Sequence, residues 1–285
     1  MNKTRALSFI IVTLVYILAI IIGLFVYKLL PFHFAINLLI SDVVATVVVF
    51  IFSLILKTAS VYDPYWSVQP IVIVVAYAIR DGLNIQTLLP LIAICIWGIR
   101  LTLNWAYTFH SLSYQDWRYT LLKEKTKGFY PLINFLGIHL FPTLVVYLCM
   151  LPVSYLFHSN TENNVFVVIF FVLSLLSTLL QGISDCQMHH FKKQKTGKLI
   201  RIGVWKYSRH PNYLAEILMW WTIGLLSVFA LKDHYWLLTC ALVNTLMFLF
   251  VSIPMAENRQ AKTKEGFIEY KKQTRMLLPI KKVVK

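Results

Sequence analysis

The chain has 285 residues, of which 58% are hydrophobic and only 14% are charged, and its formal net charge at pH 7 is +15. So few charged residues exclude an ordinary soluble domain of this length and indicate an integral membrane protein. The positive charge alone would suit a nucleic-acid-binding protein, but its distribution fits membrane topology better, and we expect no nucleic-acid partner.

Taken in chain order, the apolar stretches predict membrane spans near residues 6–27, 33–56, 68–80, 86–109, 131–157, 164–184, 213–231 and 235–256. Several approach the ~20 apolar residues that cross a bilayer. The first span is too long for a secretory signal and has no small-residue cleavage site, so we expect it to remain as an anchor. The sequence therefore predicts an all-α, multi-pass membrane helical bundle with about eight transmembrane helices.

The basic residues predict the orientation of this bundle. With the N-terminus inside, nearly all of the 27 lysines and arginines fall in cytoplasmic segments, whereas the outer loops hold only Lys28, Arg80 and Lys232. This asymmetry satisfies the positive-inside rule and places both termini in the cytoplasm. The pattern fits a bacterial cytoplasmic membrane and an endoplasmic reticulum equally well.

No repeat or flexible linker divides the chain, so we expect residues 1–285 to form a single integral membrane domain. Residues 1–109 are mostly hydrophobic spans, whereas residues 110–280 carry the polar segments 110–130, 185–212 and 257–278. If these segments meet on the cytoplasmic side, they form a polar chamber over an apolar floor, which suits a soluble cofactor and a lipid-like substrate. The four scattered cysteines lack ligand spacing, so no metal site is predicted.

Three polar features in the first half of the chain lie within or beside predicted apolar spans. Asp42 is a carboxylate within the second span, and its partner is not evident. The motif Asp63-Pro64-Tyr65-Trp66 predicts a turn in which Asp63 caps the next helix and the rings form an interfacial belt. Arg100 lies inside the fourth span, four residues before Asn104, and an intramembrane arginine usually faces a cavity or a partner, so both are candidate cofactor-binding residues.

The motif Asp116-Trp117-Arg118-Tyr119 follows the fourth span. It offers a carboxylate, a planar donor and two rings that could stack on a base or a nicotinamide. An interfacial aromatic anchor with a local salt bridge explains the motif equally well. Asp116 and Arg118 are therefore candidate cofactor-binding residues with both interpretations open.

Asp185 and Lys192 lie in the cationic segment after the sixth span. They are seven residues apart and share one helix face, which favours ligand contact. A carboxylate at the membrane edge is costly without a partner. The alternative for the lysines is an interfacial helix held on anionic lipid.

The block Ser208-Arg209-His210-Pro211-Asn212-Tyr213 is the most informative segment. Proline favours the first helical position, so a helix should begin at Pro211 with free N–H groups that attract anions. Arg209 and His210 then lie where a phosphate would bind. Asn212 and Glu216 are four residues apart and share one helix face. We interpret this block as a cofactor site, over which Tyr270 of the amphipathic C-terminal tail would close.

These residues resemble a known family. Asp185-x-Gln, the block from Gly203 through Arg209-His210-Pro211-Asn212-Tyr213 to Glu216, and the ending from Tyr270 to Pro279 are similar to the C-terminal region of membrane steroid 5α-reductases. The Asp-Trp-Arg-Tyr and Asp-Pro-x-Trp motifs are similar to those of an uncharacterised, mostly bacterial branch of that superfamily. The resemblance implies a reductase that transfers hydride from NADPH, held in a cytosol-facing chamber, to a C=C bond of a lipophilic steroid-, enone- or fatty-lipid-like substrate.

The resemblance also implies residue roles. Asn212 would contact the nicotinamide and Glu216 would line the substrate end, which makes these two the candidate catalytic residues. The polarising tyrosine and glutamate of the steroid enzymes are replaced here by Trp97 and Asp42, so the proton donor stays open. The full predicted cofactor-binding set is Arg100, Asn104, Asp116, Arg118, Asp185, Lys192, Arg201, Tyr207, Arg209, His210, Asn212, Tyr213 and Tyr270.

Two alternatives remain. Isoprenylcysteine carboxyl methyltransferases have a similar Arg-His-Pro-x-Tyr block, so S-adenosylmethionine is the alternative cofactor. A non-catalytic lipid-binding membrane protein would also keep the fold. Asp-Trp-Arg-Tyr, Asp185-x-Gln and Asn212 favour the reductase. The expected partners are a lipophilic small molecule and membrane lipid; the oligomeric state is open and compatible with a monomer.

Overall fold

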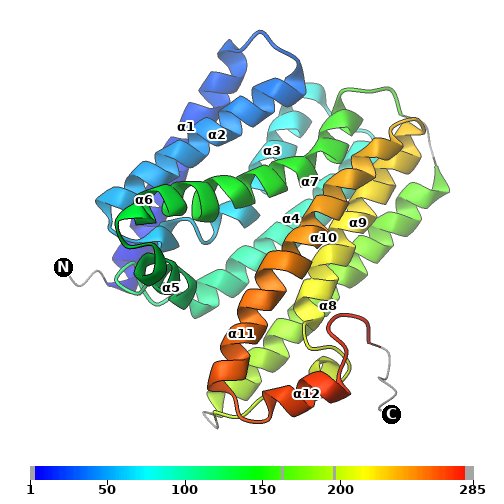
Figure 1. The fold of residues 1–285 in the computed structure, drawn as a ribbon. Coiled ribbons are helices and arrows are strands. Elements are labelled where there is room, and N and C mark those ends of the chain that lie inside the picture. Colours follow the sequence, from blue (N-terminus) through cyan, green and yellow to red (C-terminus); the bar gives the residue numbers. More distant parts are fainter. Residues whose placement is uncertain (1–3, 162–163, 195–196, 280–285) are drawn as a thin grey trace. The chain divides into compact units, whose positions relative to one another are not determined.

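The computed structural model describes residues 4–161, 164–194 and 197–279, and within these ranges it is helical, with no β-strand (Figure 1). The α-helices are α1 (Arg5–Leu29), α2 (Phe34–Ile55), α3 (Tyr65–Asp81), α4 (Ile85–Thr108), α5 (Trp117–Thr126), α6 (Tyr130–Ile133), α7 (Phe141–Phe157), α8 (Val165–Lys193), α9 (Pro211–Leu231), α10 (Leu238–Met247), α11 (Ile253–Thr263) and α12 (Phe267–Gln273). Short 3₁₀ turns are η1 (Ala59–Val61), η2 (Lys127–Phe129), η4 (Gly203–Lys206) and η5 (Tyr235–Leu237), and η3 (Asn134–Leu140) and η6 (Phe248–Ser252) are π-helical. The all-α prediction is confirmed.

Within the described ranges, seven helical segments are long and apolar enough to cross a membrane: Arg5–Leu29, Phe34–Ile55, Ile85–Thr108, Trp117–Phe157, Val165–Lys193, Pro211–Leu231 and Tyr235–Thr263. The multi-pass bundle is thus confirmed with seven such segments where about eight were predicted. The difference is α3, which has 17 residues and falls short of the ~20 that span a bilayer. The cytoplasmic placement of both termini stays a prediction.

Contacts divide the chain into two compact units. Unit 1 comprises Met1–Gly82 and Trp97–Phe157, and unit 2 comprises Leu83–Ile96 and His158–Lys285. The boundary cuts α4, so the two parts of this helix belong to different units. Each unit is described by itself below, and the single-domain expectation stays a prediction.

Unit 1 is built around the packing of α1 on α2, with α7 against α2 and α3. Val12, Tyr16, Ala19 and Gly23 recur every three or four residues and form the buried stripe of α1. A Cβ on Gly23 would lie 3.3 Å from the Cβ of Ala45, so small residues allow the two backbones to approach closely.

In unit 2, α8 and α9 pack side by side and α10 packs on α9 (Figure 1). Helix α9 is the centre of this unit, with Met219, Ile223 and Leu226 fully buried. It begins at Pro211 with His210 as the N-cap residue, which confirms the predicted start. The end of α9 that carries the sequence block is therefore fixed by the fold of unit 2.

Candidate functional site

The segment before α9 is docked on the end of α8 by one glycine and one tryptophan. Gly203 has a φ of +55°, and a Cβ at this position would lie 2.2 Å from Oε1 of Gln187. That oxygen accepts a hydrogen bond of 3.0 Å from the Val204 N–H. The indole of Trp205 donates to the carbonyl oxygen of Ser184 at 3.1 Å. The glutamine of the Asp-x-Gln motif therefore acts as the docking point for the block, and the positive φ of Gly203 favours glycine beside it.

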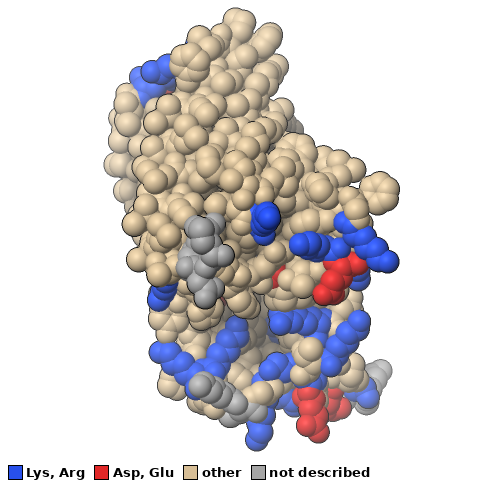
Figure 2. All heavy atoms as spheres, turned by 90° about the vertical axis from the view of Figure 1, so that its left-hand side faces the viewer, with Lys and Arg blue, Asp and Glu red and all other residues tan. Residues whose placement is uncertain are grey.

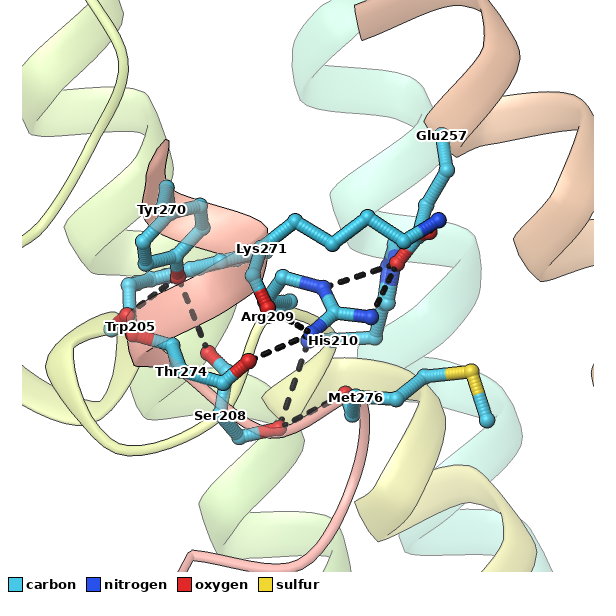
Figure 3. Close-up of polar contacts among 9 residues, drawn as sticks. All are labelled: Trp205, Ser208, Arg209, His210, Glu257, Tyr270, Lys271, Thr274 and Met276. Atoms are coloured by element: carbon cyan, nitrogen blue, oxygen red, sulfur yellow. Dashed lines mark hydrogen bonds and ion pairs between the residues drawn. The ribbon is translucent and has the colours of Figure 1, made fainter. Parts of the chain in front are cut away.

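The C-terminal segment forms a single parallel β-bridge with this block, between Ser208 and Arg275. Figure 3 shows a side-chain contact of the same pairing, in which the Ser208 hydroxyl donates to the Met276 carbonyl at 3.3 Å. The backbone N–H of Arg209 donates to the Arg275 carbonyl at 3.0 Å, and that of His210 donates to the Met276 carbonyl at 3.2 Å. The phenol of Tyr270 donates to the carbonyl oxygens of Trp205 and, at 3.2 Å, Ser208. Burial raises the pKa of Tyr270 to about 12, so the phenol keeps the proton that it donates.

Glu257 of α11 joins the two segments (Figure 3). Its Oε1 accepts from Nε and Nη2 of Arg209, each at 2.8 Å, and from Nε2 of His210 at 3.2 Å. Its Oε2 accepts from Nζ of Lys271 on α12 at 2.9 Å. Glu257 is 6% exposed and Arg209 is 7% exposed. Shielding from water makes the loss of one partner costly, because the remaining charge is left buried.

This arrangement changes the interpretation of Arg209. We expected its guanidinium to lie where a phosphate binds, but Nε and Nη2 are held by Glu257, and Nη1 donates to the Thr274 carbonyl and, at 3.4 Å, to the Lys271 carbonyl. A phosphate contact would have to compete with these bonds. Glu257, which was not among the predicted site residues, links the block to the C-terminal segment. No short-range sequence pattern predicts this contact, because Glu257 lies 48 residues from Arg209 in the chain.

The two predicted catalytic residues both lie on α9. Asn212 in the first turn is partly exposed, and its amide makes no hydrogen bond with the described residues. Glu216, one turn further, is 5% exposed and accepts a hydrogen bond of 2.9 Å from the indole of Trp220. Asn212 therefore lies at the polar entrance of the helix, whereas Glu216 lies inside the packed unit.

The other cofactor candidates of unit 2 lie on α8, in the segment before α9 and in the first turn of α9. The rings of His210 and Tyr213 are stacked, with centroids 5.3 Å apart. Arg201 is exposed, donates to the Gly266 carbonyl at 2.6 Å and lies over the Tyr270 ring. Three further candidates are Asp185, which is partly buried on α8, Lys192, which is exposed seven residues later, and Tyr207, which is 48% exposed.

Of the polar segments expected to meet, 185–212 and 257–278 thus come together in unit 2. Figure 2 shows lysine and arginine side chains gathered in the lower part of the face drawn there, below a region that is almost entirely free of charge. The exposed cations of unit 2 include Lys192, Arg201, Lys206, Lys271 and Arg275. The remaining polar segment, 110–130, belongs to unit 1.

Four cofactor candidates lie in unit 1, where local contacts explain two of them. Asp116 caps α5 by accepting from the Arg118 N–H at 2.9 Å and also pairs with Nε of Arg118 at 2.8 Å. This is the local salt bridge of the alternative interpretation. Arg100 and Asn104, the other two, are partly buried on the unit 1 part of α4.

The Asp-Pro-x-Trp and Asp-Trp-Arg-Tyr motifs meet in unit 1. The phenol of Tyr119 donates to Oδ1 of Asp63 at 2.5 Å. The expectation that Asp63 caps α3 is wrong, because the N-cap residue is Pro64 and no side chain makes the capping bond. Burial raises the pKa of Asp63 to about 6, although the charge of Arg118 and the bond from Tyr119 oppose that rise.

Asp42 accepts hydrogen bonds from two residues of α3. Its Oδ1 accepts from the Tyr65 phenol at 3.4 Å, and its Oδ2 accepts from Nε2 of Gln69. Trp97 is fully buried and packs edge-on against Trp66, with centroids 6.3 Å apart. Unit 1 therefore contains a hydrogen-bonded tyrosine–carboxyl pair, but its phenol comes from Tyr65 and not from position 97.

The chain matches the model of a known protein family. A family model described as a protein of unknown function, DUF1295, matches residues 49–274, which is most of the chain. The chain belongs to the DUF1295 family. This membrane-protein family is related to the steroid 5α-reductases.

The chain is also similar to a fungal protein. The chain is 25% identical over 234 residues to an uncharacterized protein of Schizosaccharomyces pombe, a match that covers 72% of this chain and 67% of the relative. No solved structure matches the chain. This relative is fungal, and membership of a mostly bacterial branch stays a prediction.

Proposed function

We propose that this DUF1295 protein is a membrane-embedded reductase that uses NADPH to reduce a C=C bond in a lipophilic substrate. The observation that carries the proposal is the assembly at the start of α9, where α8, the 203–210 block and the C-terminal segment are joined around Asn212 by Gln187, Tyr270 and Glu257. Together with the relationship of the family to steroid 5α-reductases, this assembly supports a nucleotide site in unit 2.

The donors at this helix start suit an anionic nucleotide. The first N–H groups of a helix have no partner within it, and the helix dipole favours negative charge there. Lys192, Lys206 and Arg275 are exposed cations of the same unit. We propose that these groups hold the phosphates, while the amide of Asn212 orients the nicotinamide and Arg209 acts through Glu257 to position the block.

NADPH, when bound, supplies the hydride that reduces one carbon of an electron-poor C=C bond. The other carbon needs a proton, and a preorganised acid lowers the barrier by stabilising the developing enolate. We propose that Glu216, which lies one turn after Asn212 on α9 and is 5% exposed, lines the substrate end of the same unit. The test is Glu216→Gln, which should lower kcat while the Kd for NADPH stays unchanged.

Cofactor identity is tested by thermal stabilisation of the purified, detergent-solubilised chain. A ligand that binds only the folded protein at 100-fold its Kd stabilises it by about 2.7 kcal/mol, which is readily seen as a rise in Tm. We expect NADPH to raise Tm and S-adenosylmethionine to leave it unchanged. Selective stabilisation by S-adenosylmethionine would instead support a methyltransferase. Binding of NADPH without its oxidation across a panel of enone lipids would support a non-catalytic lipid-binding protein.

A further inference from the structure

The π-helix η3 of unit 1 presents buried hydrogen-bond acceptors that the proposed reduction does not use. It comprises Asn134–Leu140 and precedes α7. π-Helical turns are rare and occur frequently at functional sites. His139 is fully buried and Asn134 is 2% exposed, so neither side chain is solvated from outside.

The tautomer of His139 follows from its first contact. Its Nδ1 lies 2.9 Å from the backbone carbonyl oxygen of Asn134. A carbonyl only accepts, so Nδ1 carries the proton and Nε2 presents a lone pair. Among the residues that the structure describes, Nε2 has no hydrogen-bond partner. This nitrogen is therefore a buried acceptor that lacks a donor.

The amide of Asn134 is oriented by a similar argument. Its Nδ2 lies 3.1 Å from Oγ of Ser53, and the Ser53 hydroxyl donates its own hydrogen to the Phe50 carbonyl at 2.7 Å. Ser53 can then only accept from Asn134, which fixes the NH₂ group on that side. The amide oxygen Oδ1 has no partner in the described part of the chain. Two acceptors on one π-helical segment thus require donors.

The surroundings of His139 are aromatic. Its ring centroid lies 4.7 Å from that of Tyr62 and 5.4 Å from that of Phe50. Phe135 packs on Phe50 at 4.9 Å, and the whole segment belongs to the apolar stretch Trp117–Phe157. A matching ligand combines an O–H donor with an apolar body. A ketone or an ether has no hydrogen to donate and does not satisfy these acceptors.

We propose that η3 binds the hydroxyl group of a lipophilic alcohol, whose single hydrogen is donated to Nε2 of His139. This site is independent of NADPH binding in unit 2. It specifies a donor on the ligand, whereas an enone substrate presents an acceptor oxygen to its polarising group.

The test uses the full chain in detergent with ¹⁵N-labelled histidine. The probes are a linear twelve-carbon alcohol and the methyl ketone of the same chain length. We expect the alcohol to shift the non-protonated ring-nitrogen resonance of His139 saturably, and the ketone to leave it in place. The resonance is assigned by its loss in His139→Gln.

Affinity measurements on variants complete the test. His139→Phe should weaken alcohol binding by up to about tenfold, the loss of one hydrogen bond. His139→Gln keeps an acceptor oxygen and should stay within about threefold of the unmodified chain on the same basis. Ser227→Ala, a fully buried change in unit 2, is the control and should have no effect.

Three outcomes would overturn the proposal. The first is equal binding of alcohol and ketone, which indicates simple apolar partitioning. The second is a nitrogen resonance that already has its hydrogen-bonded position without alcohol and does not move, which indicates bound water. The third is unchanged affinity in both folded His139 variants.

Discussion

The guanidinium of Arg209 donates twice to one carboxylate oxygen of Glu257, although 48 residues separate them in the chain. The other carboxylate oxygen binds Lys271, so one acidic side chain connects the start of α9 to α11 and α12. The residue that seemed placed to bind a phosphate thus has a defined structural partner. This pairing fixes the C-terminal segment against the block that carries Asn212.

Glu257→Ala should therefore destabilise unit 2. Its loss leaves Arg209 buried without its anion, for which comparable losses cost about 3–5 kcal/mol. We expect a clear fall in Tm and faster proteolysis of the C-terminal tail. Glu269→Ala on α12 removes an exposed carboxylate and serves as the control, with little change expected. An unchanged Tm in Glu257→Ala would show that the ion cluster does not hold the unit together.

Gly203→Ala tests the docking of the block on α8. The new Cβ would meet Gln187 at 2.2 Å, in addition to the strain of a positive φ. Gly197→Ala is the matched control, because Gly197 has a φ of +67° and nothing within 4 Å of an added Cβ. We expect the control to lose about 1 kcal/mol of folding free energy and Gly203→Ala to lose distinctly more. Denaturant unfolding compares the two, and equal losses would refute the steric account.

Asp63 makes the stability of unit 1 depend on pH. Burial raises its pKa from 3.8 to about 6, so the folded chain binds this proton more tightly than the unfolded chain. The resulting stabilisation is present below about pH 4 and is lost as pH rises through about 6. Asp116, Arg118 and Tyr119 face the same carboxyl group, and their charges and hydrogen bonds are included in this shift.

Asp63→Asn should remove this pH dependence. We expect Tm of the unmodified chain to fall between about pH 4 and 6 by the equivalent of on the order of 2 kcal/mol, and Tm of the variant to fall less. Asp81→Asn, which changes a carboxyl group paired with Arg80, is the control. Parallel Tm profiles for the unmodified chain and Asp63→Asn would contradict the assignment.

The sequence predicted those features that depend on local patterns. The apolar runs gave the all-α bundle, and Pro211 gave the start of α9, because a proline is tolerated best in the first turn. Asn212 and Glu216 fall on α9, and Asp185 and Lys192 fall on α8, as their spacing required. The number of membrane spans was predicted less accurately, because the 17 residues of α3 are close to the shortest length that crosses a bilayer.

Long-range pairs were not predictable from the sequence. Nothing in the spacing joins Arg209 to Glu257, Tyr119 to Asp63 or Asp42 to Tyr65, since each pair depends on how separate helices pack. Of the two aspartates in the sequence motifs, Asp63 has another contact than the predicted one, whereas Asp116 has the contact that one of its two open interpretations predicted. Asp116 forms the local salt bridge, and Asp63 binds a tyrosine instead of capping α3.

The central claim, a nucleotide site at the start of α9, is tested most directly by measuring NADPH affinity in Asn212→Ala. Asp185→Ala is the second variant, and Asp233→Ala, past the opposite end of α9, is the control. We predict that both site variants bind NADPH at least about tenfold more weakly, a loss of about 1.4 kcal/mol, while Tm and the control affinity stay unchanged. Unchanged NADPH affinity in both folded site variants would contradict the account.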